Sequence, residues 1–193
     1  MTNAAYRWAT EIMSVCWMIF VVFWVVAAFS TKKTAYRQPV AERGISGALL
    51  IAGAATLLLA QRGYPLNPSI VPHTYLTAAV ATLVTVSGLA FALWARIVLG
   101  RNWSGRVTLK ENHELILRGP YRFVRHPIYT GLLTMVLGSV LLVGRAGALL
   151  GWLVFVAGLW LKTAQEEKLL LTQFPAEYAA YRQHVRRIIP FAL

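Results

Sequence analysis

Five long apolar runs without a single charged residue constrain this chain more than any other feature. They cover residues 12–29, 45–60, 75–94, 128–143 and 146–161, and are 18, 16, 20, 16 and 16 residues long. A helix that crosses a bilayer needs about 17–25 mainly apolar residues, and Lys or Arg at its ends can reach back to the interface. The runs therefore predict an all-α polytopic membrane protein with about five transmembrane helices.

The composition supports a membrane protein and excludes several kinds of site. Only 13% of the residues are charged, against about 25% in soluble domains. The one cysteine, Cys16, lies inside the first run, so neither a disulfide framework nor a thiolate metal site is expected. The seven acidic residues are all glutamate, which excludes Ser-His-Asp triads and EF-hand loops. The histidines lack metal-ligand spacing, so we expect no metal.

The distribution of Lys and Arg predicts the orientation. Residues 30–44, 100–127 and 162–193 carry four, six and five of them, whereas Arg7, Arg62 and Arg145 are the only ones on the opposite side. Basic loops stay in the cytoplasm, so five spans place the N-terminus outside. The net charge of +12 then reflects contact with membrane lipids, and we expect no nucleic-acid partner. Nothing in the sequence indicates the oligomeric state.

The chain divides into two parts. Residues 1–98 hold the first three spans, and residues 99–193 form a C-terminal core with a cytoplasmic loop, a helical hairpin and a last helix. Only Gly144 and Arg145 separate the fourth and fifth runs, which predicts a tight hairpin. Pro175 interrupts the helical pattern of the tail.

Two polar groups flank this hairpin on the predicted cytoplasmic side. Pro127 suits the first position of the fourth helix, so His126 and Tyr129 lie beside a helix N-terminus that favours an anion. Lys162 and Glu166 are four residues apart and share a helix face, and adjacent glutamates at a helix mouth need a cationic partner. The two groups together predict a pocket for a zwitterionic amino-acid ligand.

The motifs in this region resemble those of the isoprenylcysteine carboxyl methyltransferase family of integral membrane enzymes. The resemblance lies in HELILRGPYRFVRHPIYTG followed by KTAQEEKLLLTQFPAEYAAYRQHV, and it covers residues 99–191. It implies a methyltransferase with S-adenosyl-L-methionine as methyl donor, bound in a cofactor pocket on the cytoplasmic face. Two positions depart from the family pattern: lysine replaces the usual arginine at Lys162, and His184 replaces a lysine or arginine.

The resemblance also implies roles for individual residues. It assigns to the cofactor His113, Glu114, Leu115, Ile116, Tyr121, His126, Pro127, Ile128, Tyr129 and Glu166. The first four would line the adenosine side and Tyr121 would close over it. The segment 126–129 would frame the methionine moiety, and Glu166 would bind its ammonium group.

The methyl acceptor determines which catalytic groups are needed. A prenylcysteine-like carboxylate is already ionised near neutral pH, so Lys162 would hold it and no general base is required. An amine or a thiol would need a base, for which Glu167 and His184 are the candidates. The alternatives left open are a phospholipid amine N-methyltransferase, a nicotinamide-dependent membrane reductase and a non-enzymatic membrane scaffold.

Overall fold

The computed structural model describes residues 4–29, 34–37, 40–62, 67–100, 103, 108–110 and 115–189. Five long helices follow the five apolar runs: α1 (Ala4–Ala28), α2 (Val40–Ala60), α3 (Tyr75–Leu99), α4 (Pro127–Val143) and α5 (Ala146–Gln173). A shorter helix, α6 (Pro175–His184), and a 3-10 turn, η2 (Gly119–Arg122), complete the helical part of the described chain. The predicted helical architecture is confirmed for these residues.

Three of the helices are long and apolar enough to cross a membrane, namely α1, α3 and α5, while α2 and α4 have shorter apolar stretches. The count of five crossings therefore stays a prediction. The helix α5 continues 12 residues beyond its apolar run, through Gln173. Its charged residues, including Lys162 and Glu166, consequently stand on a rigid helix and not in a loop.

A small antiparallel sheet departs from the all-α prediction. The strands β1 (Thr34–Arg37) and β2 (Thr108–Lys110) pair with Thr34 opposite Lys110 and Arg37 opposite Thr108. The strands have four and three residues, too short for a periodic pattern to stand out in the sequence. This sheet ties the segment after α1 to the segment after α3.

Local sequence signals set the helix ends. Thr74 caps α3, because its side chain accepts a hydrogen bond from the backbone N–H of Thr77. Gly144 ends α4 with a φ of 66°, in the left-handed region that glycine adopts without strain. The hairpin then turns within two residues, as predicted, and Pro175 begins α6 directly after the break at Phe174.

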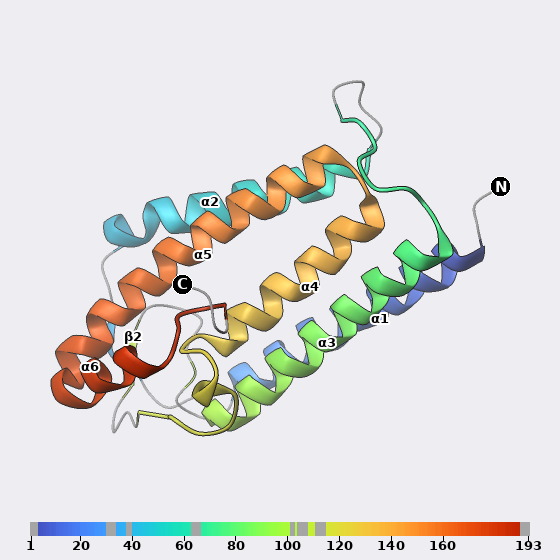
Figure 1. Ribbon diagram of the computed structural model, residues 1–193. Helices are drawn as coiled ribbons and strands as arrows, with labels where there is room; N and C mark the ends of the chain where they lie inside the picture. Colours follow the sequence, from blue (N-terminus) through green and yellow to red (C-terminus); the bar gives the residue numbers. More distant parts are fainter. Residues whose placement is uncertain are drawn as a thin grey trace.

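Glycines allow two helix pairs to pack with their backbones close together. In Figure 1, α2 runs along α5 on one side, α1 and α3 lie on the other, and α4 packs against α3. A Cβ atom added at Gly88, Gly131 or Gly138 would lie 2.7 Å or less from atoms across the α3–α4 interface. Gly53 and Gly151 play the same part between α2 and α5. Small residues permit such close approach in membrane helix pairs.

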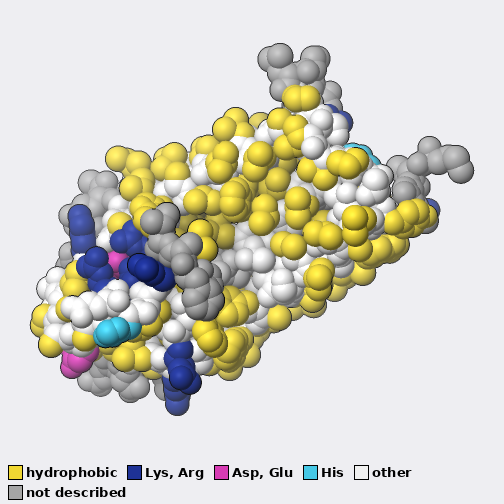
Figure 2. All heavy atoms as spheres, in the orientation of Figure 1, with side chains coloured by type: hydrophobic (Ala, Val, Ile, Leu, Met, Phe, Trp, Pro, Cys, Tyr) yellow, Lys and Arg dark blue, Asp and Glu magenta, His cyan; other side chains and the backbone are white. Residues whose placement is uncertain are grey.

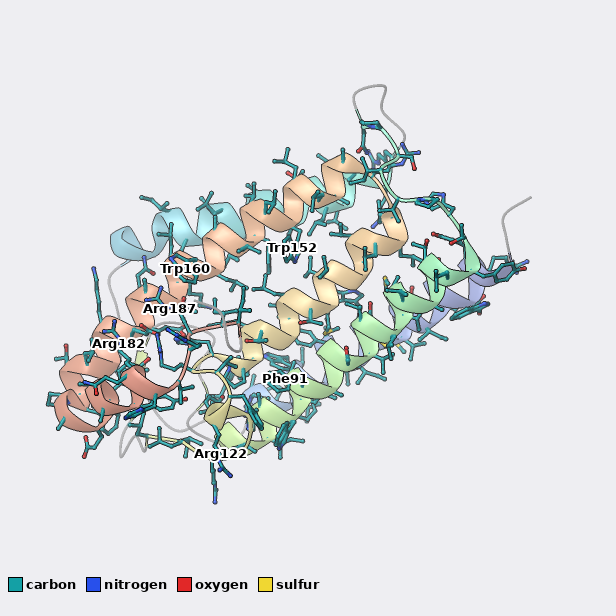
Figure 3. All side chains as sticks on the ribbon, viewed as in Figure 1. Phe91, Arg122, Trp152, Trp160, Arg182 and Arg187 are labelled. Carbon is teal, nitrogen blue, oxygen red and sulfur yellow. The ribbon has the colours of Figure 1, made fainter. Side chains whose placement is uncertain are left out.

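Contacts at one end and in the middle of the bundle link the helices. At one end, the Asn67 side chain accepts a hydrogen bond from the Gly147 backbone N–H at 2.8 Å, and Arg145 donates to the Asn67 carbonyl at 2.9 Å. At mid-bundle, the Trp152 indole donates to the Leu133 carbonyl at 3.1 Å and so links α5 to α4 (Figure 3). The arrangement fixes the angle between the two arms of the hairpin.

One arginine is buried within α3. Arg96 is 3% exposed and donates to the carbonyls of Gly100 at 2.6 Å and Ala27 at 2.8 Å. These carbonyls lie at the C-terminal ends of α3 and α1, where the helix dipoles favour a cation. Its guanidinium also lies 4.7 Å from the centre of the Trp103 ring. Arg96 therefore joins two helix ends on the side of the bundle where α4 begins.

The surface of the bundle is apolar along its length and basic at one end. Figure 2 shows hydrophobic side chains over most of the visible face, with Lys and Arg gathered mainly where α5 meets α6. Large apolar side chains such as Val26, Leu76 and Ile51 are 65–75% exposed. Such a surface suits a lipid environment.

Candidate active site

The site lies at the basic end of the bundle, where α4 begins and the apolar part of α5 ends. The 3-10 turn η2 begins at Gly119, whose φ is 61°, and leads into the Arg125-His126-Pro127 segment. Pro127 occupies the first turn of α4 and is fully buried. Because a proline keeps the preceding residue out of the helical region, His126 turns the chain just ahead of the helix.

Tyr129 and His126 both contact Glu166, and Lys162 lies over the Tyr129 ring. The Tyr129 hydroxyl donates a hydrogen bond to Glu166 Oε1 at 2.6 Å, and His126 Nδ1 lies 3.5 Å from Glu166 Oε2. The ammonium group of Lys162 lies 5.2 Å from the centre of the Tyr129 ring, within cation–π range. Contacts between residues that are 33 to 40 positions apart thus form one polar group between α4 and α5.

The neighbouring carboxylate, Glu167, is buried and surrounded by cations. Its residue is 2% exposed, and its Oε1 atom lies 2.8 Å from Arg125 Nε and 3.3 Å from His126 Nε2. Its Oε2 atom lies 3.1 Å from an Arg187 terminal nitrogen and 3.8 Å from Arg182 Nε. Both oxygens therefore have positively charged partners, which offset the cost of burying the charge.

The His126 ring lies between the two adjacent glutamates. Its Nδ1 atom faces Glu166 and its Nε2 atom faces Glu167. The hydrogen-bond roles of these nitrogens depend on the tautomer. The ring also stacks on Tyr129, with centroids 5.9 Å apart and planes 18° from parallel. His126 is thus the point at which the Glu166 group and the Glu167 group meet.

The C-terminal segment 185–189, called the tail segment below, runs against the start of α4. The backbone N–H groups of Arg125 and His126 donate to the carbonyls of Arg186 and Arg187 at 2.8 and 3.0 Å. The Thr130 hydroxyl donates to the carbonyl of Ile188. These bonds fasten the tail segment in an extended form beside the residues that precede α4.

An aromatic and apolar cluster lies next to the polar group. Tyr121 and Ile128 are buried there with Ala95, and Ile116 and Tyr129 pack against them. The Tyr181 hydroxyl from α6 donates to the Tyr121 carbonyl. Burial raises the pKa of the Tyr121 and Tyr181 phenols far above the usual value, so both remain neutral. The site thus combines charged groups with an apolar wall.

Most of the predicted site residues come together, with a few exceptions. His113 and Glu114 lie outside the described residues. Leu115 is half-buried ahead of η2, and His184 is exposed at the end of α6. The roles predicted for all of the site residues stay predictions. This includes the catalytic roles of Lys162, Glu167 and His184.

Sequence reasoning missed the contribution of the tail. Arg182 and Arg187 counted only as charges that set the orientation, yet both approach Glu167. Arg187 also lies over the Trp160 ring at 4.6 Å, and Figure 3 shows the two side chains together beside α5. The sequence does carry a local signal that one face of α6 packs against the bundle. Tyr178 and Tyr181 are three residues apart, so they share a helix face, and both are buried.

Comparisons with known proteins point to one family. Residues 79–172, from α3 to the end of α5, match the model of the isoprenylcysteine carboxyl methyltransferase family. The chain is 27% identical over 154 residues to a probable protein-S-isoprenylcysteine O-methyltransferase of Oryza sativa subsp. indica, covering 71% of this chain and 81% of that protein. It is 34% identical over 102 residues to the protein-S-isoprenylcysteine O-methyltransferase of Schizosaccharomyces pombe, covering 50% and 42%. It is also 30% identical over 157 residues to methanethiol S-methyltransferase 1 of Bradyrhizobium diazoefficiens, covering 74% and 53%.

Proposed function

Because this chain belongs to the isoprenylcysteine carboxyl methyltransferase family and is a methyltransferase, we propose that it transfers a methyl group from S-adenosyl-L-methionine to a lipophilic carboxylate. The observation that carries this proposal is the meeting of His126, Tyr129 and Glu166 within a few ångströms at one end of the bundle. The proposed acceptor is a prenylcysteine-like molecule, and the proposed site faces the cytoplasm.

The residues of the site fit the methyl donor chemically. S-adenosyl-L-methionine supplies an electrophilic methyl group on a sulfonium. Glu166 is the partly exposed carboxylate that would bind the ammonium group of the donor, with Tyr129 holding one carboxylate oxygen by a 2.6 Å hydrogen bond. The cluster around Tyr121 offers an apolar wall for the adenosine.

A carboxylate acceptor requires few catalytic groups from the protein. It is ionised at neutral pH, so it attacks without losing a proton and no general base is needed. The protein then contributes positioning and the exclusion of water. Lys162 lies one helix turn before Glu166 and would hold the acceptor anion beside the donor, while the lipid tail would lie between helices in the hydrocarbon.

The proposed orientation follows from the charge distribution. The exposed Arg118, Arg122 and Arg186 lie on the same end of the bundle as the site, and Figure 3 shows Arg122 pointing away from the helices. Arg7, Arg62 and Arg145 lie at the other end. By the positive-inside rule, this distribution supports a site on the cytoplasmic face, where anionic lipids attract basic groups.

The experiment uses the purified full chain in detergent. S-adenosyl-L-methionine is titrated by calorimetry, and methyl transfer to an S-farnesylated cysteine derivative is compared with transfer to its carboxamide. We expect binding, and a base-labile methyl ester from the free acid only. Glu166→Gln should weaken donor binding about tenfold to a hundredfold, as expected for a hydrogen bond to a charged group. Glu177→Gln, an exposed glutamate on α6, is the matched control.

Two results would contradict the proposal. The donor assignment is wrong if the wild-type chain does not bind S-adenosyl-L-methionine, or if Glu166→Gln and Glu177→Gln bind it equally well. The acceptor assignment is wrong if the donor binds but no ester forms. Phosphatidylethanolamine is assayed in parallel, because an N-methylated headgroup would identify the amine alternative.

A thiol is the second candidate acceptor. The similarity to a methanethiol S-methyltransferase extends over 74% of this chain. A thiol is mostly protonated at neutral pH, since even the cysteine side chain has a pKa of about 8.5, so transfer requires removal of a proton. His184 is exposed at the end of α6, whereas Glu167 already has cationic partners at both oxygens. Methylation of methanethiol that is lost in His184→Ala, with no ester from the farnesylated acid, would favour this candidate.

A further inference from the structure

We propose that Arg187 is a positioning residue, which latches the tail segment to Glu167 and thereby holds His126 in place to complete the donor site. This inference rests on the proposed function, because it names a further residue on which donor binding depends. Arg187 lies 20 positions from Glu167 and 61 from His126. The three residues come together only in the folded chain.

The side chain of Arg187 is held on two sides. One terminal nitrogen donates to Glu167 Oε2 at 3.1 Å, and the guanidinium lies 4.6 Å from the centre of the Trp160 ring. The side chain is 17% exposed. A planar guanidinium can stack on an aromatic ring and donate from its edge at the same time, which a lysine ammonium cannot do.

The contacts of Arg187 form a closed circuit with His126. The Arg187 carbonyl accepts the His126 backbone N–H at 3.0 Å, while its guanidinium binds Glu167. The other oxygen of Glu167 lies 3.3 Å from His126 Nε2. Both the backbone and the ring of His126 are therefore located by Arg187, one directly and one through Glu167.

These contacts determine which ring nitrogen of His126 faces the proposed donor site. With Nε2 held at Glu167, the ring presents Nδ1 to Glu166, at 3.5 Å. If the Arg187 contact is lost, Glu167 keeps Arg125 and His126 but loses a partner at Oε2. The buried carboxylate then shifts toward its remaining partners, and the His126 ring moves with it. The expected consequence is weaker donor binding rather than a changed acceptor site.

Arg186 provides a matched control because it is adjacent and identical in type. Its side chain is exposed, whereas Arg187 is largely covered. Both residues offer their carbonyls to the segment before α4, and an alanine at either position preserves those carbonyls. A difference between Arg186→Ala and Arg187→Ala thus reports on the side chain alone.

The test measures donor dissociation constants by calorimetry, together with kcat and the KM values for donor and acceptor. Arg187→Ala should raise the donor dissociation constant about tenfold to a hundredfold, with the acceptor KM within about threefold of wild type. Arg186→Ala should stay within about twofold of wild type on both measures. Arg187→Lys keeps the charge without the stacked plane and should fall between wild type and Arg187→Ala.

A double-mutant cycle separates latching from a general loss of stability. In a Glu167→Gln background, Arg187→Ala should weaken donor binding far less than it does in the wild type. If Arg187→Ala fails to fold, Arg187→Lys takes its place in the same cycle.

The proposal is overturned if Arg187 and Arg186 variants bind the donor alike, or if the effects of Arg187 and Glu167 add independently. It is also overturned if donor and acceptor KM rise in parallel, as a general structural role would predict. Failure of the wild-type chain to bind S-adenosyl-L-methionine would instead refute the proposed function itself, so the two failures are distinguishable.

Discussion

Replacing Gly138 by alanine tests whether close backbone packing between α3 and α4 supports the bundle. A Cβ atom at Gly138 would lie 2.1 Å from Thr85 Oγ1, 2.7 Å from the Ala81 carbonyl oxygen and 2.9 Å from the Thr85 backbone nitrogen. The Thr85 hydroxyl can rotate away only by giving up its 2.9 Å hydrogen bond to Ala81. The other two atoms belong to the backbone, so the helices themselves must move apart.

The size of the effect follows from this geometry. A separation of roughly half an ångström forfeits about a quarter of the dispersion energy of the atom pairs concerned. Overpacking of a well-packed interface costs about 1–3 kcal/mol. We therefore expect Gly138→Ala to lower the free energy of unfolding by about 1–3 kcal/mol, even though alanine is the better helix former by up to about 1 kcal/mol.

The assay is thermal unfolding in one detergent at a fixed scan rate, followed by tryptophan fluorescence. Gly47→Ala on α2 is the control, because nothing lies within 4 Å of the added Cβ atom and the change should be neutral or stabilising. Thr85→Ala combined with Gly138→Ala should recover only part of the loss, since the backbone contacts remain. Equal unfolding temperatures for Gly138→Ala and Gly47→Ala would refute the packing argument.

Three further predictions concern single side chains. Tyr129→Phe should weaken binding of S-adenosyl-L-methionine about tenfold in calorimetry, because Glu166 loses its 2.6 Å hydrogen bond; unchanged affinity would contradict the role of that bond. Arg96→Ala should lower the free energy of unfolding by about 1–3 kcal/mol, because two helix-end carbonyls lose their donor, and thermal unfolding beside an Arg62→Ala control measures it. Lys162→Ala should raise the KM of a carboxylate acceptor while leaving the donor dissociation constant near that of wild type, and an effect on the donor alone would reverse the assignment.

Much of the helical framework could be predicted from the sequence, because apolar runs without charge have few alternatives to a membrane helix. Gly144-Arg145 and Pro175 marked a hairpin and a break where the structure has them. The short β1–β2 pair could not be predicted, because it joins segments about 70 residues apart that lack a periodic pattern. The burial of Arg96 could not be predicted either, because its hydrogen-bond partners are backbone carbonyls, which every residue carries.

The candidate site could be predicted in part, because some of its residues are marked by local sequence spacing. Lys162 and Glu166 share a helix face by their spacing, and His126 with Pro127 marks the start of α4. The surroundings of Glu167 depend on contacts across 42 and 20 positions, which no local pattern encodes. Arg186 and Arg187 looked equivalent in the sequence. They differ because successive side chains of an extended segment point to opposite sides, so one faces solvent and the other faces Trp160.

The two-residue hairpin at Gly144 and Arg145 has a mechanical consequence for the opposite end of the bundle. The helix α4 has 17 residues, so its first turn lies about 25 Å from the hairpin at 1.5 Å per residue. A rotation of about 2° at the hairpin would displace that first turn by about 1 Å, enough to open or close the gap between His126 and Glu166. By holding the hairpin at one angle, the Asn67 contacts with Arg145 and Gly147 therefore help to set the spacing of His126 and Glu166 at the other end of the bundle.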